Sequence, residues 1–340
     1  MTINDSHPSS GRFISKSHLF RICGKMQFVL LAGLVLLPQL LSAQWNATVG
    51  AQSHDLGRQG LAFLPNEIWI HAGDSITWTM AVDEGHTLTF LTDGQVRPFF
   101  AAGCPGFSAG SATFDGISCI TTGILNKGEK FTVVFPLAGN FKLVCLIHEN
   151  MTGTVHVLDP SQSLPHDQAF YDREARREGV ALLADEDEDA ARPKHHHSAN
   201  RVTVGGGKVV ATGGGSDTSS VMRFDDPVIT IHAGETLEWT NDDPVTPHTV
   251  TFGTEPQNPF PPSPNVTMDA DGARHAVLNS PSDSAHSGLI QAAPQDRVGL
   301  AQAPSGVTRF RVTFNKPGTY PYICALHDVL GMKGKVIVLP

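Results

Sequence analysis

The stretch CALHDVLGMKG, residues 324–334, holds a cysteine, a histidine three residues later and a methionine five residues after that. A shorter version, CLIHENMTG, occupies residues 145–153 and keeps the same order of Cys, His, Met and Gly. The loop at residues 324–334 has two more residues between His and Met than the loop at residues 145–153. This recurrence indicates that one functional unit occurs twice in the chain.

The likeness between the two copies extends to the sequence before each loop. Residues 130–148, KFTVVFPLAGNFKLVCLIH, align without a gap on residues 309–327, RFRVTFNKPGTYPYICALH. Further upstream, IWIHAGDSITWT at residues 68–79 matches ITIHAGETLEWT at residues 229–240. Blocks that recur in the same order over such a distance indicate a duplicated domain, and two copies are too few for a solenoid.

Short strands are predicted on both sides of the turn that precedes each loop. Apolar residues alternate with the others in KFTVVF, residues 130–135, and in FKLVC, residues 141–145, and Pro and Gly lie between these runs. The second copy repeats this pattern in RFRVTF and YPYIC. A period of two with one apolar face is typical of antiparallel β-sandwiches. We therefore predict an all-β fold in which each Cys closes a strand and each His and Met lies on the following loop.

The first 43 residues have the layout of a secretory signal peptide. Four basic residues precede the apolar run MQFVLLAGLVLLPQLLSA at residues 26–43, which ends in small residues. We expect cleavage near Ala43 and a periplasmic or secreted protein with no stable membrane insertion afterwards. An uncleaved membrane anchor is the alternative, although Pro38 and the short run argue against it. Cleavage would leave a net charge of −12, which argues against nucleic acid as a partner.

The length and composition fit two domains and a linker. The chain has 340 residues and 40% hydrophobic content, which is enough for two cores. We assign residues 44–158 to a first domain, residues 159–200 to a linker and residues 201–340 to a second domain. In the linker, Asp167 can cap a helix that runs to about Ala184.

The helix predicted in the linker has Tyr171, Ala175 and Leu182 along one side. The acidic run at residues 185–189 that follows is expected to be solvated and mobile. His195, His196 and His197 could capture a metal ion, but a flexible segment provides no preset geometry for one.

The cysteines divide into those of the repeated loops and a separate pair. Cys23 lies in the predicted signal peptide, and Cys145 and Cys324 occupy the loops. Cys104 and Cys119 remain, in a Gly- and Ser-rich insertion that the second half does not share. In an oxidising compartment these two are expected to form a disulfide, and two free thiols are the alternative.

Each half supplies four residues that suit one metal ion. The two sets are His86, Cys145, His148 and Met151, and His248, Cys324, His327 and Met332. A single Met or His is usually part of a core or a surface, but the same four residue types in the same order twice indicate a site. The soft sulfur suits Cu(I) and the imidazoles accept Cu(II), whereas zinc prefers four close ligands and has little use for Met. We therefore predict a copper ion in each half.

The sequence HTVTF, followed by PGTYPYICALHDVLGMKGKVIV, resembles the cupredoxin family, the type 1 blue copper proteins such as plastocyanin, pseudoazurin and amicyanin. The resemblance covers roughly residues 44–157 and 199–340. It implies two tandem cupredoxin-like Greek-key β-sandwiches, each with copper near one end, and electron transfer between redox partner proteins.

The same resemblance implies a role for each ligand. The two His and the Cys of each set would be equatorial ligands, and Met151 and Met332 would be axial. The loop before Met332 resembles that of plastocyanin in length, and the shorter loop before Met151 resembles that of amicyanin. The His on each loop, His148 or His327, would lie at an exposed end and be the exit for electrons to a partner.

Two other functions remain as alternatives. Multicopper oxidases and copper nitrite reductases are also built from cupredoxin domains, but in those enzymes a His beside the Cys links a second kind of copper. Neither Cys145 nor Cys324 has a His beside it, so we expect an electron carrier and not an enzyme. Copper carriage or storage stays open because the same ligands serve it.

Three further histidines receive no ligand role. His71 and His232 recur in the two HAG turns and are expected to be turn residues. His156 lies on the last predicted strand of the first half and has no counterpart in the second. A structural role is sufficient for it.

Overall fold

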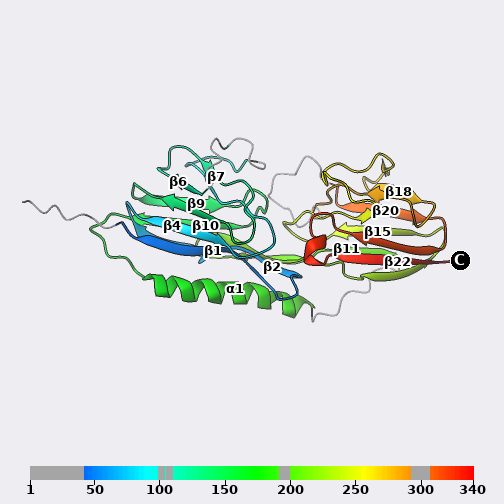
Figure 1. Cartoon of the computed structure of the whole chain (residues 1–340), viewed down its shortest axis with the longest axis horizontal. Coiled ribbons are helices and arrows are strands. Elements are labelled where there is room, and N and C mark those ends of the chain that lie inside the picture. Colours follow the sequence, from blue (N-terminus) through cyan, green and yellow to red (C-terminus); the bar gives the residue numbers. More distant parts are fainter. Residues whose placement is uncertain (1–41, 99–103, 105–109, 191–199, 292–306) are drawn as a thin grey trace, which may run out of the picture. The chain divides into compact units, whose positions relative to one another are not determined.

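The computed structural model of the chain describes residues 42–98, 104, 110–190, 200–291 and 307–340. These residues form two β-sandwiches and one α-helix (Figure 1). Strands coloured blue to green make up most of the first sandwich, and strands coloured yellow to red make up most of the second. The predicted all-β class with two tandem sandwiches is confirmed. Residues 1–41 of the predicted signal peptide, and His195, His196 and His197, lie outside the described residues.

The first sandwich is built mainly from the first repeat. Its own strands are β1 (Gln44–Gln52), β2 (Arg58–Leu64), β3 (Glu67–His71), β4 (Ser75–Met80), β5 (Thr89–Phe90), β6 (Ser111–Thr113), β7 (Ile120–Thr121), β8 (Lys130–Val134), β9 (Gly139–Val144) and β10 (Thr152–Leu158). One sheet contains β2-β1-β4-β8-β6 and the other β3-β10-β9-β5-β7. The chain crosses repeatedly between the sheets, as in a Greek-key sandwich.

The second sandwich repeats this topology. Its strands are β11 (Arg201–Val204), β14 (Val228–His232), β15 (Thr236–Asn241), β16 (Thr251–Phe252), β17 (Thr267–Met268), β18 (Arg274–Leu278), β19 (Ala285–His286), β20 (Arg309–Phe314), β21 (Gly318–Ile323) and β22 (Lys333–Leu339). The order β14-β22-β21-β16-β19 matches β3-β10-β9-β5-β7 strand for strand, and the facing sheet is β11-β15-β20-β18-β17. The duplication read from the sequence is therefore a duplication of fold.

The repeated apolar residues form the two cores in the same register. Trp78 on β4 lies opposite Phe131 on β8, and Trp239 on β15 lies opposite Phe310 on β20. All four side chains are buried. The alternating positions that the sequence analysis placed on one face of β8 and β20 are buried, as a strand with a period of two requires. These cores hold the strand ends from which the Cys–His–Met loops extend.

A hairpin of the second repeat belongs to the sheet of the first. Strands β12 (Gly207–Ala211) and β13 (Ser216–Val221) pair with each other, and β13 pairs antiparallel with β2. The sequence analysis assigned these residues to the second domain, and in the structure they extend the first sheet of the first sandwich by two strands. Pairing covers the edge of β2, whose backbone groups would otherwise lack partners in the sheet.

Helix α1 (Gln168–Ala190) lies against β1, β2 and β13 (Figure 1). Asp167 caps it as predicted, since its side-chain oxygen accepts a hydrogen bond from the Phe170 N–H at 2.8 Å. The predicted end near Ala184 is wrong, because the helix continues through the acidic run to Ala190. Adding a residue to an existing helix costs little because the nucleus has already formed, and this outweighs the low helix propensity of the Asp residues in the run. Within the described residues, no helix has the length and apolar character needed to cross a membrane.

Cys104 and Cys119 form the predicted disulfide, with their Cα atoms 5.5 Å apart. Both residues are buried. The bond closes a loop of sequence separation 15 in the region that distinguishes the first sandwich from the second. It therefore joins the two ends of this segment covalently.

Removing this disulfide is expected to lower the free energy of unfolding by about 3 kcal/mol, because the open loop gains conformational entropy in the unfolded chain. The test is urea denaturation of the metal-free Cys104→Ser/Cys119→Ser protein beside the wild type. Wild-type protein treated with a thiol reductant serves as the control and should match the variant. Equal midpoints for the oxidised wild type and the variant would contradict this role.

Candidate metal centres

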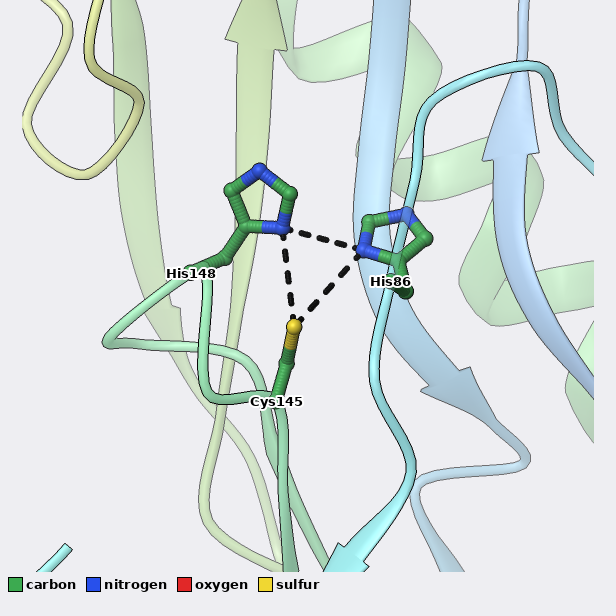
Figure 2. A group of neighbouring side chains, drawn as sticks. All are labelled: His86, Cys145 and His148. Atoms are coloured by element: carbon green, nitrogen blue, oxygen red, sulfur yellow. Dashed lines mark hydrogen bonds between the residues drawn. The ribbon is translucent and has the colours of Figure 1, made fainter. Parts of the chain in front are cut away.

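Three side chains of the first domain converge on one point (Figure 2). The Nδ1 atoms of His86 and His148 lie 3.0 Å apart, and the Cys145 Sγ lies 3.9 Å and 3.7 Å from them, respectively. All three side chains are fully buried. Donor atoms that surround a single ion at about 2.0–2.3 Å lie roughly 3–4 Å from one another. The triad is therefore already arranged as a metal site.

The fold positions these residues from two loops. Cys145 directly follows β9, and the loop after it folds back because the Cys145 N–H donates to the Met151 carbonyl at 3.0 Å. The Met151 N–H donates to the His148 carbonyl at 3.2 Å, which closes the turn that carries the imidazole. His86 lies on the segment between β4 and β5 and forms a bridge with Leu125. Residues 59 positions apart are thus fixed by backbone pairing at one end of the sandwich.

The second domain builds the same triad from His248, Cys324 and His327. The Nδ1 atoms of the two imidazoles lie 3.0 Å apart, and the Cys324 Sγ lies 3.9 Å from His248 and 3.4 Å from His327. With its two extra residues this loop includes the 3-10 helix η2 (Asp328–Leu330), which is capped at its C-terminal end by Gly331. Gly331 has a φ of 92°, a left-handed conformation that favours glycine. The longer loop therefore differs by one helical turn and keeps the same convergence of donors.

The two methionines occupy matching places beside the triads. Met151 and Met332 are both fully buried and belong to the cores of their domains. The Met332 carbonyl accepts from the Cys324 N–H at 3.1 Å, as the Met151 carbonyl does from Cys145. The structure thus brings the Cys and the His of each loop together with the distant His, and it places the backbone of each Met against the same Cys.

Comparison with known protein families identifies the family to which the chain belongs. The family model for copper binding proteins of the plastocyanin/azurin family matches residues 51–158 and residues 209–339. The chain belongs to this family. It carries the cupredoxin domain twice, in tandem, as the resemblance of its sequence implied.

Individual relatives cover one part of the chain each. Amicyanin-alpha of Methylorubrum extorquens is 31% identical over 117 residues, which are 34% of this chain and 65% of that protein. Among solved structures, oxidised plastocyanin from Dryopteris crassirhizoma is 22% identical, with a TM-score of 0.22 over 41% of this chain and 99% of that one. A reduced amicyanin mutant is 16% identical, with a TM-score of 0.23 over 34% of this chain and 82% of that one.

Each cupredoxin domain also supplies hydrogen bonds to its sulfur atom. The Thr87 N–H donates to the Cys145 Sγ at 3.4 Å, and the Thr249 N–H donates to the Cys324 Sγ at 3.3 Å. The hydroxyl oxygen of each Thr accepts from the backbone N–H after the Cys at 2.7 Å. The sequence analysis missed these residues, although a Thr follows the upstream His in both copies. Such contacts tune a bound metal and fix the orientation of its ligands.

Both cysteines favour the thiolate in the metal-free protein. Burial opposes ionisation of Cys145, but hydrogen bonds from His148 and His86 outweigh it and hold the pKa of this thiol well below its usual value. In the second domain burial is outweighed by the charge of His327 and by its hydrogen bond and that of His248, which lower the pKa of Cys324 in the same way. Since the thiolate is the form that binds metal, both centres are prepared for a soft cation.

The chemistry of the donor set fits copper. A thiolate and two imidazoles, buried with a thioether nearby, match the preference of Cu(I) for soft sulfur and of Cu(II) for nitrogen. The closed setting of the donors excludes water from the point where they meet. Among the described residues, two groups of three or more His, Cys, Asp or Glu side chains could hold a metal ion, and they are these two triads.

The prediction that the loop histidines lie at an exposed end is wrong. His148 is 0% exposed and His327 is 3% exposed. Both border one cavity of about 230 Å³, lined by residues of both domains that include Leu146, Val245 and Leu326. The two histidines are buried because the apolar surfaces around the two loops cover each other instead of facing water.

The three histidines without a predicted ligand role lie outside the triads. The His71 ring pairs with the Gln162 carbonyl at 2.8 Å. His156 lies between Asn140 and Glu67 and stacks on Trp69. Neither of these rings, nor the exposed His232, belongs to a triad.

Proposed function

We propose that this protein is an electron-transfer protein with a type 1 copper in each domain. His86, Cys145, His148 and Met151 would hold the first copper, and His248, Cys324, His327 and Met332 would hold the second. The observation that carries the proposal is the convergence of two complete Cys–His–His sets, each with donor separations of 3.0–3.9 Å. When bound, copper supplies a one-electron couple.

The chain's own residues then define the environment of that couple. The buried cysteines provide the thiolates, and the backbone N–H groups of Thr87 and Thr249 stabilise charge on sulfur. The hydrogen-bonded loops between Cys and Met hold the imidazoles in place without metal. Ligands fixed in advance need little rearrangement, which favours rapid electron transfer.

Copper carriage is the second candidate, because the same ligands could deliver an ion. A carrier has to release its metal to a partner, which requires accessible donors. Here the six donor side chains of the triads are 0–3% exposed. This burial favours retention of copper and hence electron transfer. An enzyme with substrate chemistry of its own is disfavoured by the same enclosure.

We also propose that the protein works in the periplasm or outside the cell, with redox proteins as partners. The signal-peptide pattern of residues 1–43 supports export. The disulfide between Cys104 and Cys119 supports an oxidising compartment.

Copper titration of the mature protein, followed by visible and electron paramagnetic resonance spectra, tests the proposal. It expects two coppers per chain, an intense thiolate-to-Cu(II) absorption, and reversible reduction with the metal retained. Loss of copper on reduction would favour carriage. A protein that remains colourless with excess Cu(II) would overturn the assignment.

A further inference from the structure

One carboxylate lies between the two metal centres. Glu84 belongs to the segment between β4 and β5, two residues before His86, and its side chain is 10% exposed. Its Oε1 lies 3.4 Å from the Nε2 of His148, and its Oε2 lies 3.4 Å from the Nε2 of His327. Each oxygen thus faces the loop histidine of a different domain.

The surroundings of Glu84 leave it few other partners. The cavity that it borders is lined mainly by apolar side chains, which include Ile124, Leu146 and Leu326. Arg97 also borders this cavity, but its Nε donates to the Cys145 carbonyl at 3.0 Å. Within the described part of the chain, the ion pairs of Glu84 are with these two imidazoles. A carboxylate this buried requires such partners.

Among the described residues of the second repeat, no carboxylate makes an equivalent contact with both loop histidines. There the buried Asp243 approaches the upstream His of its own domain, with its Oδ2 3.6 Å from the Nε2 of His248. The same carboxylate accepts hydrogen bonds from the backbone N–H groups of Val245 and Thr246. Asp243 therefore serves one centre, whereas Glu84 reaches both.

The ring atoms that face Glu84 decide what it can do. In both loop histidines Nδ1 faces the sulfur and Nε2 faces the carboxylate. A neutral imidazole that binds a metal through Nδ1 carries its hydrogen on Nε2, where a carboxylate can accept it. Such a partner fixes the tautomer and the orientation of the ring and raises the affinity for metal.

We propose that Glu84 is a positioning residue shared by both metal centres and that it couples them. The inference rests on the proposed copper sites. With its Nδ1 bound to metal, His148 would carry its hydrogen on Nε2, where the Oε1 of Glu84 would accept it. The second oxygen then receives the Nε2–H of His327, which leaves the Nδ1 of that ring free for metal. Filling one centre therefore prepares the other.

The decisive test measures Cu(I) affinity in proteins with one intact centre. In the Cys145→Ser background only the second centre remains. A residue of the first domain should therefore change the Cu(I) affinity only if it contacts the second domain. Glu84→Ala is expected to weaken this second centre about 10- to 100-fold. Asp83→Asn is the matched control, because Asp83 pairs with Lys127, and it should leave the affinity unchanged. Equal affinity with and without Glu84 would overturn the proposal.

Nitrogen-15 magnetic resonance of the histidine rings separates positioning from general loosening of the structure. In the metal-free protein and in the Cu(I) form, the Nε2 signals of His148 and His327 should both shift in Glu84→Ala, while that of His248 stays. Glu84→Gln keeps the size of the side chain but has one acceptor oxygen, so it should restore one ring and not both. Unshifted Nε2 signals in metal-free Glu84→Ala would also overturn the inference.

These results distinguish the two proposals. If neither single-centre protein binds Cu(I) tightly, the proposed function fails, and the metal-free spectra still decide the role of Glu84. If both bind copper tightly and Glu84→Ala changes neither affinity, the copper sites stand and the coupling is refuted.

Discussion

Cys145→Ser is expected to remove about half of the intense visible absorption and one of the two coppers, and Cys324→Ser to remove the other half. A serine hydroxyl offers neither the soft sulfur that Cu(I) prefers nor the thiolate from which the charge-transfer band arises. Because each cysteine is buried in its own triad, the loss at saturating copper should be confined to one centre, and the coupling through Glu84 should change only the affinity of the other. Absorption spectra with metal analysis of each variant measure it.

The double variant Cys145→Ser/Cys324→Ser should be colourless with excess Cu(II). Cys104→Ser/Cys119→Ser is the matched control, since it also replaces two cysteines but changes neither triad. That protein should keep its full absorption under conditions where it is folded. If Cys145→Ser retained the complete spectrum, the first centre would have been assigned wrongly.

The repeated sequence was sufficient to find the two triads, because every member recurs in the same order. The same comparison could have identified Thr87 and Thr249, since each follows the upstream His, but a Thr on a strand is ordinarily part of the sheet. Glu84 could not be found in this way. Its counterpart region contains Asp243, which makes a different contact, and the role of Glu84 depends on where two distant loops meet.

The hairpin of β12 and β13 shows a second limit of pattern reading. The sequence of β13, SDTSSV, lacks alternating apolar residues, yet four of its residues are buried. They are buried through hydrogen bonds and strand pairing, for example from the Ser219 hydroxyl to the Leu182 carbonyl of α1. Hydropathy predicts burial of apolar groups and does not register polar groups whose partners come from another part of the chain.

Asp217, on this hairpin, is an unfavourable place for a charge. Its side chain is 2% exposed, and its Oδ1 accepts from the Asn66 amide at 2.8 Å. The nearby Glu178 of α1 accepts from the Asn66 N–H. Burial, together with the charge of Glu178, raises the pKa of Asp217 from 3.8 to about 8. The folded protein therefore keeps a proton on this carboxyl near neutral pH.

The free energy of unfolding of the wild type is expected to fall as the pH rises, because Asp217 is protonated more strongly in the folded chain than in the unfolded chain. Asp217→Asn is expected to abolish this fall. Below pH 4 the acid is protonated in the folded and unfolded chains alike, so it has no effect on the free energy of unfolding. Between about pH 4 and pH 8 only the folded state holds the proton, and stability falls by up to about 1.4 kcal/mol per pH unit. Above pH 8 the loss is complete and constant.

Asparagine keeps the acceptor for Asn66 and does not titrate, so the variant should gain roughly 4 kcal/mol over the wild type between pH 5 and pH 8, as an upper estimate. Urea denaturation of the metal-free proteins at a series of pH values measures the difference. Asp93→Asn, which removes an exposed carboxylate, controls for the change in net charge. Parallel pH profiles for the wild type and Asp217→Asn would show that Asp217 is not protonated in the folded protein, and the docking of the hairpin on β2 would then have to accommodate a buried negative charge beside Glu178.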